Sequence, residues 1–515
     1  GGHCSFSHSS ELVPHLVDLM LLSLLLLIPF SGALGLLLWP TTQSSERIRI
    51  GAIVILAVQC VASFALLLPF DPTDAALQLV EQARWVHSIG LDYALAVDGL
   101  SLPLVLMNAV LCLVAAVASR SIDNRPRIYF ALLLVISGAV NGAFLSQNLL
   151  LFFLFYELEL IPLWLLIAVW GGANRSYAAT KFLIVTAVSG MLILGAFLGL
   201  AFVTGTMDFS LRPILSGELG LKAQFLLMGA LLIGFGIKIP LFPFHTWLPD
   251  AHTEASTPVS VLLAGVLLKL GTYGLLRFCL GLFPEAWQLA APWLAAWAAI
   301  SVLYGSLAAI AQTDMKRMVA YSSVGHMGYV LLAAAAATPL GLMGALFQMI
   351  SHGLISGVLF LLVGVVYART GTRDLNVLRG LLNPERGLPL TGSLMIIGVM
   401  ASAGIPGMAG FISEFLIFRG SLQPFPVATL LSMVGSGLTA VYFLLLVNRA
   451  FFGRLAIAPG EVVNPRILDP VALREQVPAI ALSLGVLALG LAPELLSNLS
   501  EAATTGLSQL SGGLS

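Results

Sequence analysis

Long apolar segments separated by short polar turns follow one another along nearly the whole chain. Each is about 20 residues long, which is the length an α-helix needs to cross the hydrocarbon core of a bilayer. Fourteen such segments lie near residues 17–39, 48–70, 100–119, 128–147, 149–170, 178–203, 223–248, 258–281, 287–311, 317–336, 341–367, 388–418, 424–448 and 477–496. The pattern predicts an all-α polytopic membrane protein with about 14 transmembrane helices and no soluble domain.

The turns between these segments differ in charge. One alternate set holds sixteen of the 24 Lys and Arg residues, and it comprises residues 40–47, 119–127, 171–176, 249–257, 312–317, 367–387 and 448–476 with their flanks. The opposite set holds Arg84, Arg212, Lys222 and Arg419. Because basic residues gather on cytoplasmic turns, we expect both termini and the acidic loop 71–99 on the outer side.

Composition supports a membrane location. The chain has 515 residues, of which 58% are hydrophobic and 10% are charged, whereas a soluble domain has roughly 25% charged residues. The net charge of −1 argues against nucleic acid as a partner. Residues 1–15 lack the basic segment of a signal peptide and are interpreted as an N-terminal extension.

Cysteine usage argues against a metal or haem centre. The four cysteines, Cys4, Cys60, Cys112 and Cys279, are isolated from one another in the sequence. None forms a Cys-x-x-Cys pair or a cluster with ligand spacing, so iron–sulfur, structural zinc and c-type haem sites are not expected. The sequence therefore predicts no bound cofactor.

Two apolar segments contain helix breakers beside an ionisable residue. Residues 234–254, "GFGIKIPLFPFHTWLPDAHTE", place Lys238 two positions before Pro240, and Pro243 follows. Residues 401–418, "ASAGIPGMAGFISEFLIF", place Pro406 ahead of Glu414. Broken backbone is tolerated at membrane depth only where it is buried in protein or lines a wet cavity. We therefore expect Lys238 to exchange protons with internal water rather than to extend to the membrane surface.

Interrupted helices at corresponding positions of two halves are typical of inverted repeats. The sequence thus predicts a first repeat at 128–281 and a second at 287–448. They follow an N-terminal unit, 1–127, and precede a C-terminal helical unit, 449–515.

Two glutamates, Glu157 and Glu159, lie in the fifth apolar segment. Residues two positions apart on a regular helix differ by about 200° in direction. We therefore expect Glu157 to face Lys238 and to carry proton coupling, and Glu159 to serve assembly or a partner contact. A structural ion pair between helices remains the alternative for each.

Further ionisable residues lie within other apolar segments. Placed in order, Glu157, Lys238, Lys269, His326, His352 and Glu414 form a polar thread from one half to the other, and His245 follows the first break. Acids, amines and imidazoles in alternation are the composition of a proton relay. The alternatives for the histidines are hydrogen-bonded contacts between helices and haem ligation, and paired haem-ligand spacing is missing.

At these residues the sequence resembles the antiporter-like subunits of respiratory complex I. The resemblance rests on "KIPLFPFHTWLPDAHTEASTPVSVLLAGVLLKLGTYGLLRF", "DMKRMVAYSSVGHMGYV" and "GIPGMAGFISEFLIF", and Glu414 resembles the subunit-M type. It implies a proton-translocating subunit without a cofactor, with other membrane-arm subunits and lipid as neighbours and the hydrophilic arm as an indirect partner. It also implies that Glu157, Lys238, Lys269 and Glu414 are the key residues and that His245, His326 and His352 are relay histidines.

The stretch "YELELIPLWLLIAVWGGANRSYAATKF" resembles the D subunit of the cyanobacterial and chloroplast enzyme. That resemblance implies ferredoxin-linked plastoquinone reduction and a thylakoid location. The sequence from "FYELELIPLWLL" to "TAVSGMLIL" is similar to that of variant D subunits of CO2-uptake complexes. This similarity implies CO2-hydrating subunits as partners. Two other interpretations remain: a subunit of a multi-subunit sodium/proton antiporter, and a scaffold with inert ion pairs.

Overall fold

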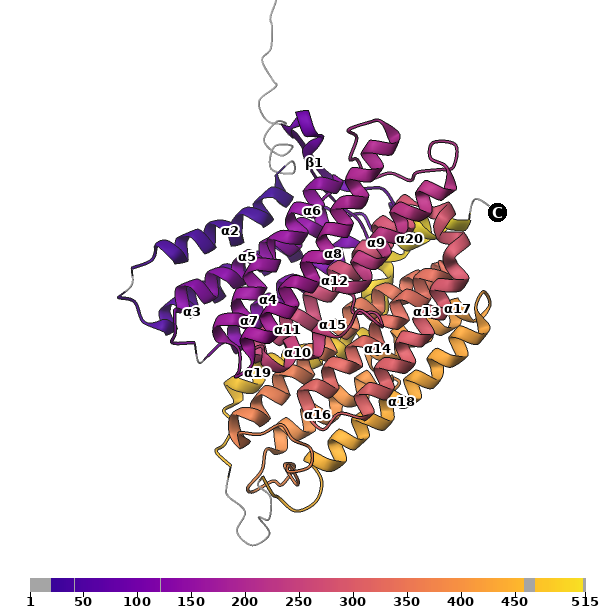
Figure 1. The fold of residues 1–515 in the computed structure, drawn as a ribbon. Coiled ribbons are helices and arrows are strands. Elements are labelled where there is room, and N and C mark those ends of the chain that lie inside the picture. The colour runs from indigo at the N-terminus through magenta and orange to yellow at the C-terminus, as the bar shows by residue number, and fades with distance from the viewer. Residues whose placement is uncertain (1–19, 41, 121, 458–467, 513–515) are drawn as a thin grey trace, which may run out of the picture.

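A computed structural model describes residues 20–40, 42–120, 122–457 and 468–512, and it shows a bundle of α-helices with one β-hairpin (Figure 1). The first half consists of α2 (Leu21–Leu38), α3 (Ser45–Ala65), β1 (Gln78–Val86), η1 (His87–Ile89), β2 (Leu91–Val97), α4 (Ser101–Ala118), α5 (Pro126–Leu145), α6 (Leu149–Leu158), α7 (Leu160–Trp170), α8 (Arg175–Thr204), α9 (Leu221–Lys238) and α10 (Trp247–Glu254). The second half consists of α11 (Thr257–Leu262), η2 (Leu263–Leu267), α12 (Leu268–Gly274), η3 (Leu275–Leu280), α13 (Pro284–Ile310), α14 (Met315–Ala336), α15 (Pro339–Thr370), α16 (Pro389–Ser402), α17 (Ala409–Leu422), α18 (Pro426–Ala450), α19 (Leu473–Leu491) and α20 (Glu494–Gly512). The extension predicted for residues 1–15 lies outside the described residues.

The helices match the apolar segments of the sequence. Among the described residues, 13 helical stretches are long and apolar enough to cross a membrane. The predicted span 388–418 is present as two shorter helices, α16 and α17, with turns between them. With this interrupted pair the predicted segments are all accounted for, and the prediction of an all-α polytopic fold is confirmed.

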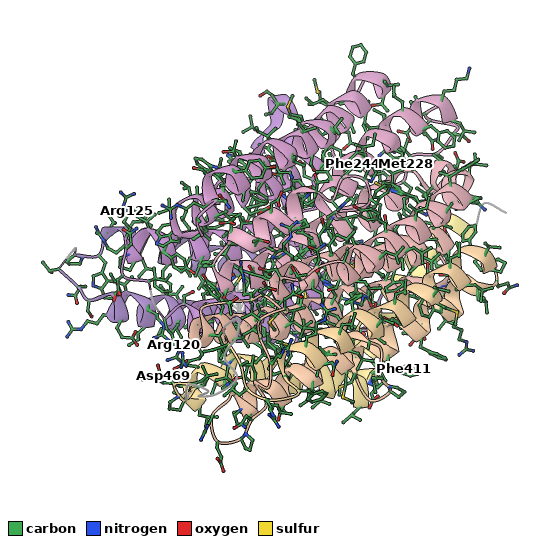
Figure 2. The ribbon with its side chains drawn as sticks, turned by 60° about the horizontal axis from the view of Figure 1, so that its bottom comes forward. Arg120, Arg125, Met228, Phe244, Phe411 and Asp469 are labelled. Atoms are coloured by element: carbon green, nitrogen blue, oxygen red, sulfur yellow. The ribbon has the colours of Figure 1, made fainter. Side chains whose placement is uncertain are left out.

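Contacts between turns divide the ends of the bundle into the two sets that the charge pattern predicts. The isolated β-bridges join turns of the same set: Asp314–Asp374 and Arg379–Ala456 among the basic turns, and Leu95–Ser146 and Asn148–Ser210 among the others. Arg120, Arg125 and Asp469, all from basic turns, lie toward the same end of the bundle in Figure 2. One end of the bundle, called here the basic face, therefore carries the basic turns.

The segment 71–99, which the sequence predicted only as a loop, contains an antiparallel hairpin of β1 and β2 at the top of Figure 1. Glu81 of β1 is buried and accepts hydrogen bonds from the backbone N–H groups of Leu22 at 2.7 Å and Ser23 at 3.0 Å. These donors have no partner within their own helix because they lie in its first turn. The hairpin thus caps the start of α2.

A second element beyond the predicted spans is α20, which packs on α15 and α13. Its buried positions, Leu496, Ser500, Thr504 and Leu507, recur every three or four residues and so form one face. Polar residues occupy much of that face, which is why a search for continuous apolar stretches does not find the helix.

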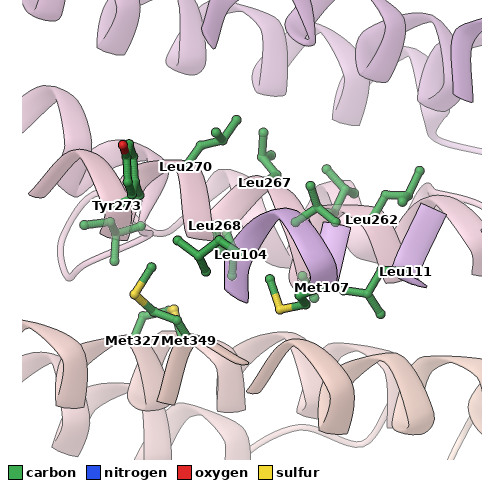
Figure 3. Close-up of a cluster of buried hydrophobic side chains, with 14 of the residues drawn as sticks. Leu104, Met107, Leu111, Leu262, Leu267, Leu268, Leu270, Tyr273, Met327 and Met349 are labelled. Carbon is green, nitrogen blue, oxygen red and sulfur yellow. The ribbon is translucent and has the colours of Figure 1, made fainter. Parts of the chain in front are cut away.

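The centre of the bundle is the span from α11 to η3, whose apolar window is completely buried. Figure 3 shows its leucines, among them Leu262 and Leu268, in one cluster with Leu104 and Met107 of α4 and with Met327 and Met349. The π-helical segments η2 and η3 flank α12 in this span. Since π-helical turns leave backbone groups displaced from the regular pattern, the most buried helix is also locally irregular.

The two faces of the bundle make a test of orientation possible. Ser88 lies exposed in the hairpin turn, and Asn376 lies exposed among the basic turns. With basic turns on the cytoplasmic side, a membrane-impermeant maleimide should label Ser88→Cys only from the outer side and Asn376→Cys only from the cytoplasmic side. The unsubstituted chain gives the background from its own cysteines. Labelling of Ser88→Cys from the cytoplasmic side would reverse the predicted orientation.

Candidate functional site

The first break follows Lys238, the last residue of α9. Pro240 cannot donate a backbone hydrogen bond, so the regular ladder stops there. Two indoles satisfy carbonyl groups around the break: Trp247 donates to Ile237 at 2.8 Å and Trp297 donates to Phe242 at 2.5 Å. The two carbonyl groups beside the break are therefore hydrogen bonded, while Pro243 and Thr246 within it are exposed at the surface of this chain.

Lys238 forms a buried ion pair with Glu159, not with Glu157. The two side chains are 1% and 0% exposed, and the Lys238 ammonium also lies 4.1 Å from the centre of the Tyr156 ring. The expectation that Glu157 faces Lys238 is wrong. The two glutamates do face different sides of the helix, as expected, but Glu159 is the one on the side of Lys238, and Glu157 lies against Gly190 of α8.

Glu157 is half-buried and lies against α8. Its Oε1 atom has no hydrogen-bond partner among the described residues. A Cβ atom at Gly190 would collide with the Glu157 carboxylate, so glycine is the residue that leaves room for it. Among the described residues, Glu157 thus forms no ion pair, although it lies within electrostatic range of Lys238.

The second group centres on Lys269, which is fully buried in α12. Its Nζ atom donates to the Ala264 carbonyl of η2 at 2.9 Å and lies 2.7 Å from Nδ1 of His352. The other ring nitrogen of His352 lies 3.0 Å from the hydroxyl of Ser323. In the part of the chain that the structure describes, no carboxylate lies within ion-pair distance of Lys269, so an imidazole is its hydrogen-bond partner.

His326 continues this group on α14. Its ring centre lies 5.7 Å from that of His352, and Nε2 is 3.0 Å from the hydroxyl of Ser402. The Gln348 amide lies 3.2 Å from Nδ1. Because an amide nitrogen only donates, Nδ1 accepts this bond and Nε2–H donates to Ser402. Neutral His326 is therefore held in one tautomer.

The second break brings Glu414 to the same place. Gly404, between α16 and α17, has φ +72°, and a Cβ atom there would approach the Glu414 carboxylate. Glu414 accepts a 2.5 Å hydrogen bond from Ser436. A small cavity of about 10 Å³ is lined by His326, His352 and Glu414, which is close to the smallest volume that holds one water molecule. A single water there would connect imidazole to carboxylate.

His245 stands apart from these groups. It lies in the first break, where its ring packs 4.7 Å from that of Tyr304 and 5.8 Å from that of Phe242. Its Nδ1 atom has no partner among the described residues. The structure therefore joins Lys269, His352, His326 and Glu414 in one group, pairs Lys238 with Glu159, and leaves Glu157 and His245 outside both.

Among the buried ionisable residues outside the predicted site, two lie close to it. His252 is fully buried in α10, and Lys316 is 4% exposed at the start of α14. His252 lies on α10, just beyond the break that holds His245, and its place within an apolar segment was a usable signal. Lys316 was assigned to a basic turn, and its burial depends on packing against α10 that the sequence does not reveal.

The arrangement suits proton transfer between side chains. Amines, imidazoles, carboxylates and hydroxyls stand within hydrogen-bond distance of one another in a water-poor interior, and such groups pass protons without forming other bonds. Over the described ranges, no group of three or more His, Cys, Asp or Glu residues is placed to hold a metal ion.

The chain is similar to proteins of known kind along most of its length. Residues 146–440 match the family described as NADH:quinone oxidoreductase/Mrp antiporter, transmembrane. The NAD(P)H-quinone oxidoreductase chain 4 1 of Synechococcus sp. (strain JA-3-3Ab) is 43% identical over 500 residues, which cover 94% of this chain and 92% of that protein. The chain 4 2 protein of Thermosynechococcus vestitus (strain NIES-2133 / IAM M-273 / BP-1) is 43% identical over 85% of this chain and 83% of its own length.

Solved structures show the same fold. A chain of respiratory complex I from Thermus thermophilus with bound NADH superposes with a TM-score of 0.84 and 29% identity, covering 96% of this chain and all of that one (100%). A chain of the Mrp complex from Dietzia sp. DQ12-45-1b superposes with a TM-score of 0.82 and 23% identity, covering 97% and 100%. Because the Mrp chain is only 23% identical, its similarity to this chain shows a shared fold alone.

The ion pair predicts a double-mutant result. Glu159→Gln should destabilise the protein by about 3–5 kcal/mol, because it leaves a buried ammonium without its countercharge. Glu159→Gln combined with Lys238→Met should lose less than Glu159→Gln alone. Glu157→Gln is the matched control and should change stability least, since Glu157 forms no ion pair in the part of the chain that the structure describes. Melting temperatures of the detergent-purified protein measure all three, and a larger loss for Glu157→Gln would contradict the observed pairing.

Proposed function

This chain belongs to the NADH:quinone oxidoreductase/Mrp antiporter transmembrane family, and from that premise we propose that it is the proton-translocating membrane-arm subunit of an NAD(P)H- or ferredoxin-linked plastoquinone oxidoreductase. Its relatives at 43% identity are named as chains of such an oxidoreductase. The subunit contributes to the enzyme by moving protons, while quinone reduction takes place elsewhere in the complex.

The observation that carries the proposal is the buried Lys238–Glu159 pair at the end of a broken helix. Replacing a buried ion pair by apolar residues is often neutral or stabilising. A pair kept at this depth is therefore better explained by function than by stability. The adjoining break supplies what proton exchange needs, namely backbone outside the regular helical ladder beside an amine.

The second group supplies the continuation of the pathway. In our proposal protons move among Lys269, His352, His326 and Glu414, whose contacts include the 2.7 Å bond between Lys269 and His352 and the cavity beside Glu414. Glu157 forms no ion pair among the described residues and takes the role of a proton-binding carboxylate toward a neighbouring subunit. His245 lies at the first break and serves the exchange between Lys238 and water.

Each half of the proposed pathway lies in one predicted repeat. Residues 128–281 contain α9 and α10 with the first break, and residues 287–448 contain α16 and α17 with the second. In each five-span unit the broken helix is the fourth, and a helix with ionisable residues is the second. This correspondence supports two inverted repeats, each carrying one half of the proton path.

The partners in this proposal are other membrane-arm subunits and lipid, with the hydrophilic arm acting indirectly. Cyanobacterial relatives support a thylakoid location. The local sequence of residues 156–195 further supports the CO2-uptake form, in which CO2-hydrating subunits join the complex.

The second candidate is a subunit of a sodium/proton antiporter. It draws support from the fold shared with the Mrp complex. The oxidoreductase is favoured because the curated relatives at 43% identity carry that name over nearly the whole chain.

Substitutions at Lys238 test the role of its proton. Lys238→Met keeps the apolar stem and Lys238→Arg keeps the charge but does not release its proton. Both should assemble, and both should lower quinone-linked proton pumping at least about tenfold, the scale of a lost proton-transfer group. Lys222→Met, an exposed position at the start of the same helix, should pump normally. Near-normal pumping by Lys238→Arg would show that only the charge is needed.

The CO2-uptake assignment predicts a growth phenotype. Deleting the gene in the source organism should impair growth at limiting CO2 more than respiration, because this form serves inorganic-carbon uptake. Complementation with the intact gene should restore growth. A respiratory defect with normal carbon uptake would instead favour the respiratory form.

A further inference from the structure

Three arginines gather at the basic face, where the N-terminal and C-terminal parts of the chain meet. Arg49 of α3 donates to the carbonyl of Val117 in α4 at 3.1 Å. Arg120, just beyond α4, donates to the carbonyl of Arg474 in the first turn of α19 at 2.6 Å. Figure 2 shows Arg120 at the edge of the bundle. These three arginines, called here the arginine cluster, join the ends of α3, α4 and α19.

The carboxylates within electrostatic range of the arginine cluster, Glu46 and Glu475, are both engaged. Glu46 pairs with Arg49 at 2.7 Å, and Glu475 pairs with Arg369 of α15, also at 2.7 Å. Among the described residues, neither of the other two arginines of the cluster has a carboxylate within ion-pair distance. The cluster therefore holds two guanidinium groups without a countercharge from the described part of the chain.

The two unpaired guanidinium groups also have donors to spare. Arg120 donates to the Arg474 carbonyl, and the Arg474 side chain donates to none of the described residues. Burial lowers the pKa of Arg120, and the positive charges of Arg49 and Arg474 lower it further. The planar fork of a guanidinium group matches the oxygens of a phosphate or sulfonate. An oxyanion between Arg120 and Arg474 would thus relieve their repulsion and accept from their free donors.

A stripe of partly exposed apolar residues leads from the arginine cluster into the membrane along α4. Leu106, Val110, Leu113 and Val117 are partly exposed and recur every three or four residues, so they share one face of the helix. From the first to the last of them the helix rises about 16 Å, at about 1.5 Å per residue. That length is about half of the hydrocarbon core of roughly 30 Å. The stripe, called here the α4 stripe, therefore spans one leaflet.

The helices α3 and α19 stand on either side of α4 at its basic end. Both pack on α4, whereas α3 and α19 are not closely packed on each other. Val58 of α3 and Val477 of α19 remain exposed, so these helices present apolar side chains outward. The α4 stripe is thus the floor of a shallow groove with apolar walls. An acyl chain fits such a groove, and a lipid brings its charged headgroup to the depth of the cluster.

We propose that the arginine cluster and the α4 stripe bind one anionic glycerolipid. Its phosphate or sulfonate headgroup lies between Arg120 and Arg474, and one acyl chain lies along residues 106–117. The bound lipid holds the end of α4 against the start of α19 and so joins the N-terminal unit to the C-terminal unit. The proposal goes beyond proton translocation and does not depend on it.

Photochemical cross-linking in the assembled complex tests the site. The complex is reconstituted in phosphatidylcholine vesicles that contain phosphatidylglycerol with a photoactivatable acyl chain, and the labelled residues are mapped by mass spectrometry. Residues 106–117 should be labelled, and unlabelled phosphatidylglycerol should compete whereas unlabelled phosphatidylcholine should not. This competition is measured on the unsubstituted complex, so it tests the site even if the variants do not assemble.

Substitution of the two unpaired arginines tests the headgroup site. Arg120→Gln combined with Arg474→Gln should lower the labelling at least about tenfold, the effect of one lost charge-assisted hydrogen bond. Arg454→Gln is the control, since Arg454 is exposed among the basic turns but lies outside the arginine cluster. It should be labelled as strongly as the unsubstituted complex.

Four results would each overturn the lipid site. Equal labelling of residues 106–117 by photoactivatable phosphatidylcholine would show that the groove does not select an anion. Unchanged labelling of the double variant, or an equal loss in Arg454→Gln, would show that the arginine cluster does not hold the headgroup. Displacement of the label by inorganic phosphate would identify a site for a soluble anion. Absence of label from residues 106–117 would mean that another subunit covers the α4 stripe.

Discussion

The scarcity of water inside the bundle is the constraint on which the rest of the structure depends. Each polar group there needs a partner within the protein, because an unpaired backbone group costs several kcal/mol in hydrocarbon. The break after α9 shows how the chain meets this demand, with the indoles of Trp247 and Trp297 supplying donors where Pro240 stops the ladder. At this break, large side chains thus supply the donors that the interrupted ladder lacks.

The same constraint explains why the two buried lysines have different partners. Lys238 has a carboxylate partner, Glu159, whereas Lys269 is met by an imidazole and a carbonyl. The first arrangement holds a charge, and the second favours an amine that shares a proton with its neighbour. A path built from both kinds of site has a point where a proton is retained and a point from which it moves on easily.

Much of the fold and part of the site could be predicted from the sequence. Apolar length located the spans, and proline with glycine located both breaks, because these signals are local. The partner of Lys238 could not be predicted, since helical spacing shows that Glu157 and Glu159 face different sides but not which side packs against α9. Burial of Lys316 depends on contacts between distant helices, and α20 has too polar a buried face to be found by hydropathy.

The cap that Glu81 places on the start of α2 has a consequence for biogenesis. The two are 59 residues apart in the chain, so at about 5–20 residues per second the first helix waits roughly 3–12 s during synthesis before its cap has been made. Over that interval the N–H groups at its first turn remain hydrated at the membrane surface. Synthesis of the hairpin therefore supplies the acceptor for the first turn of α2 only after that helix has been made.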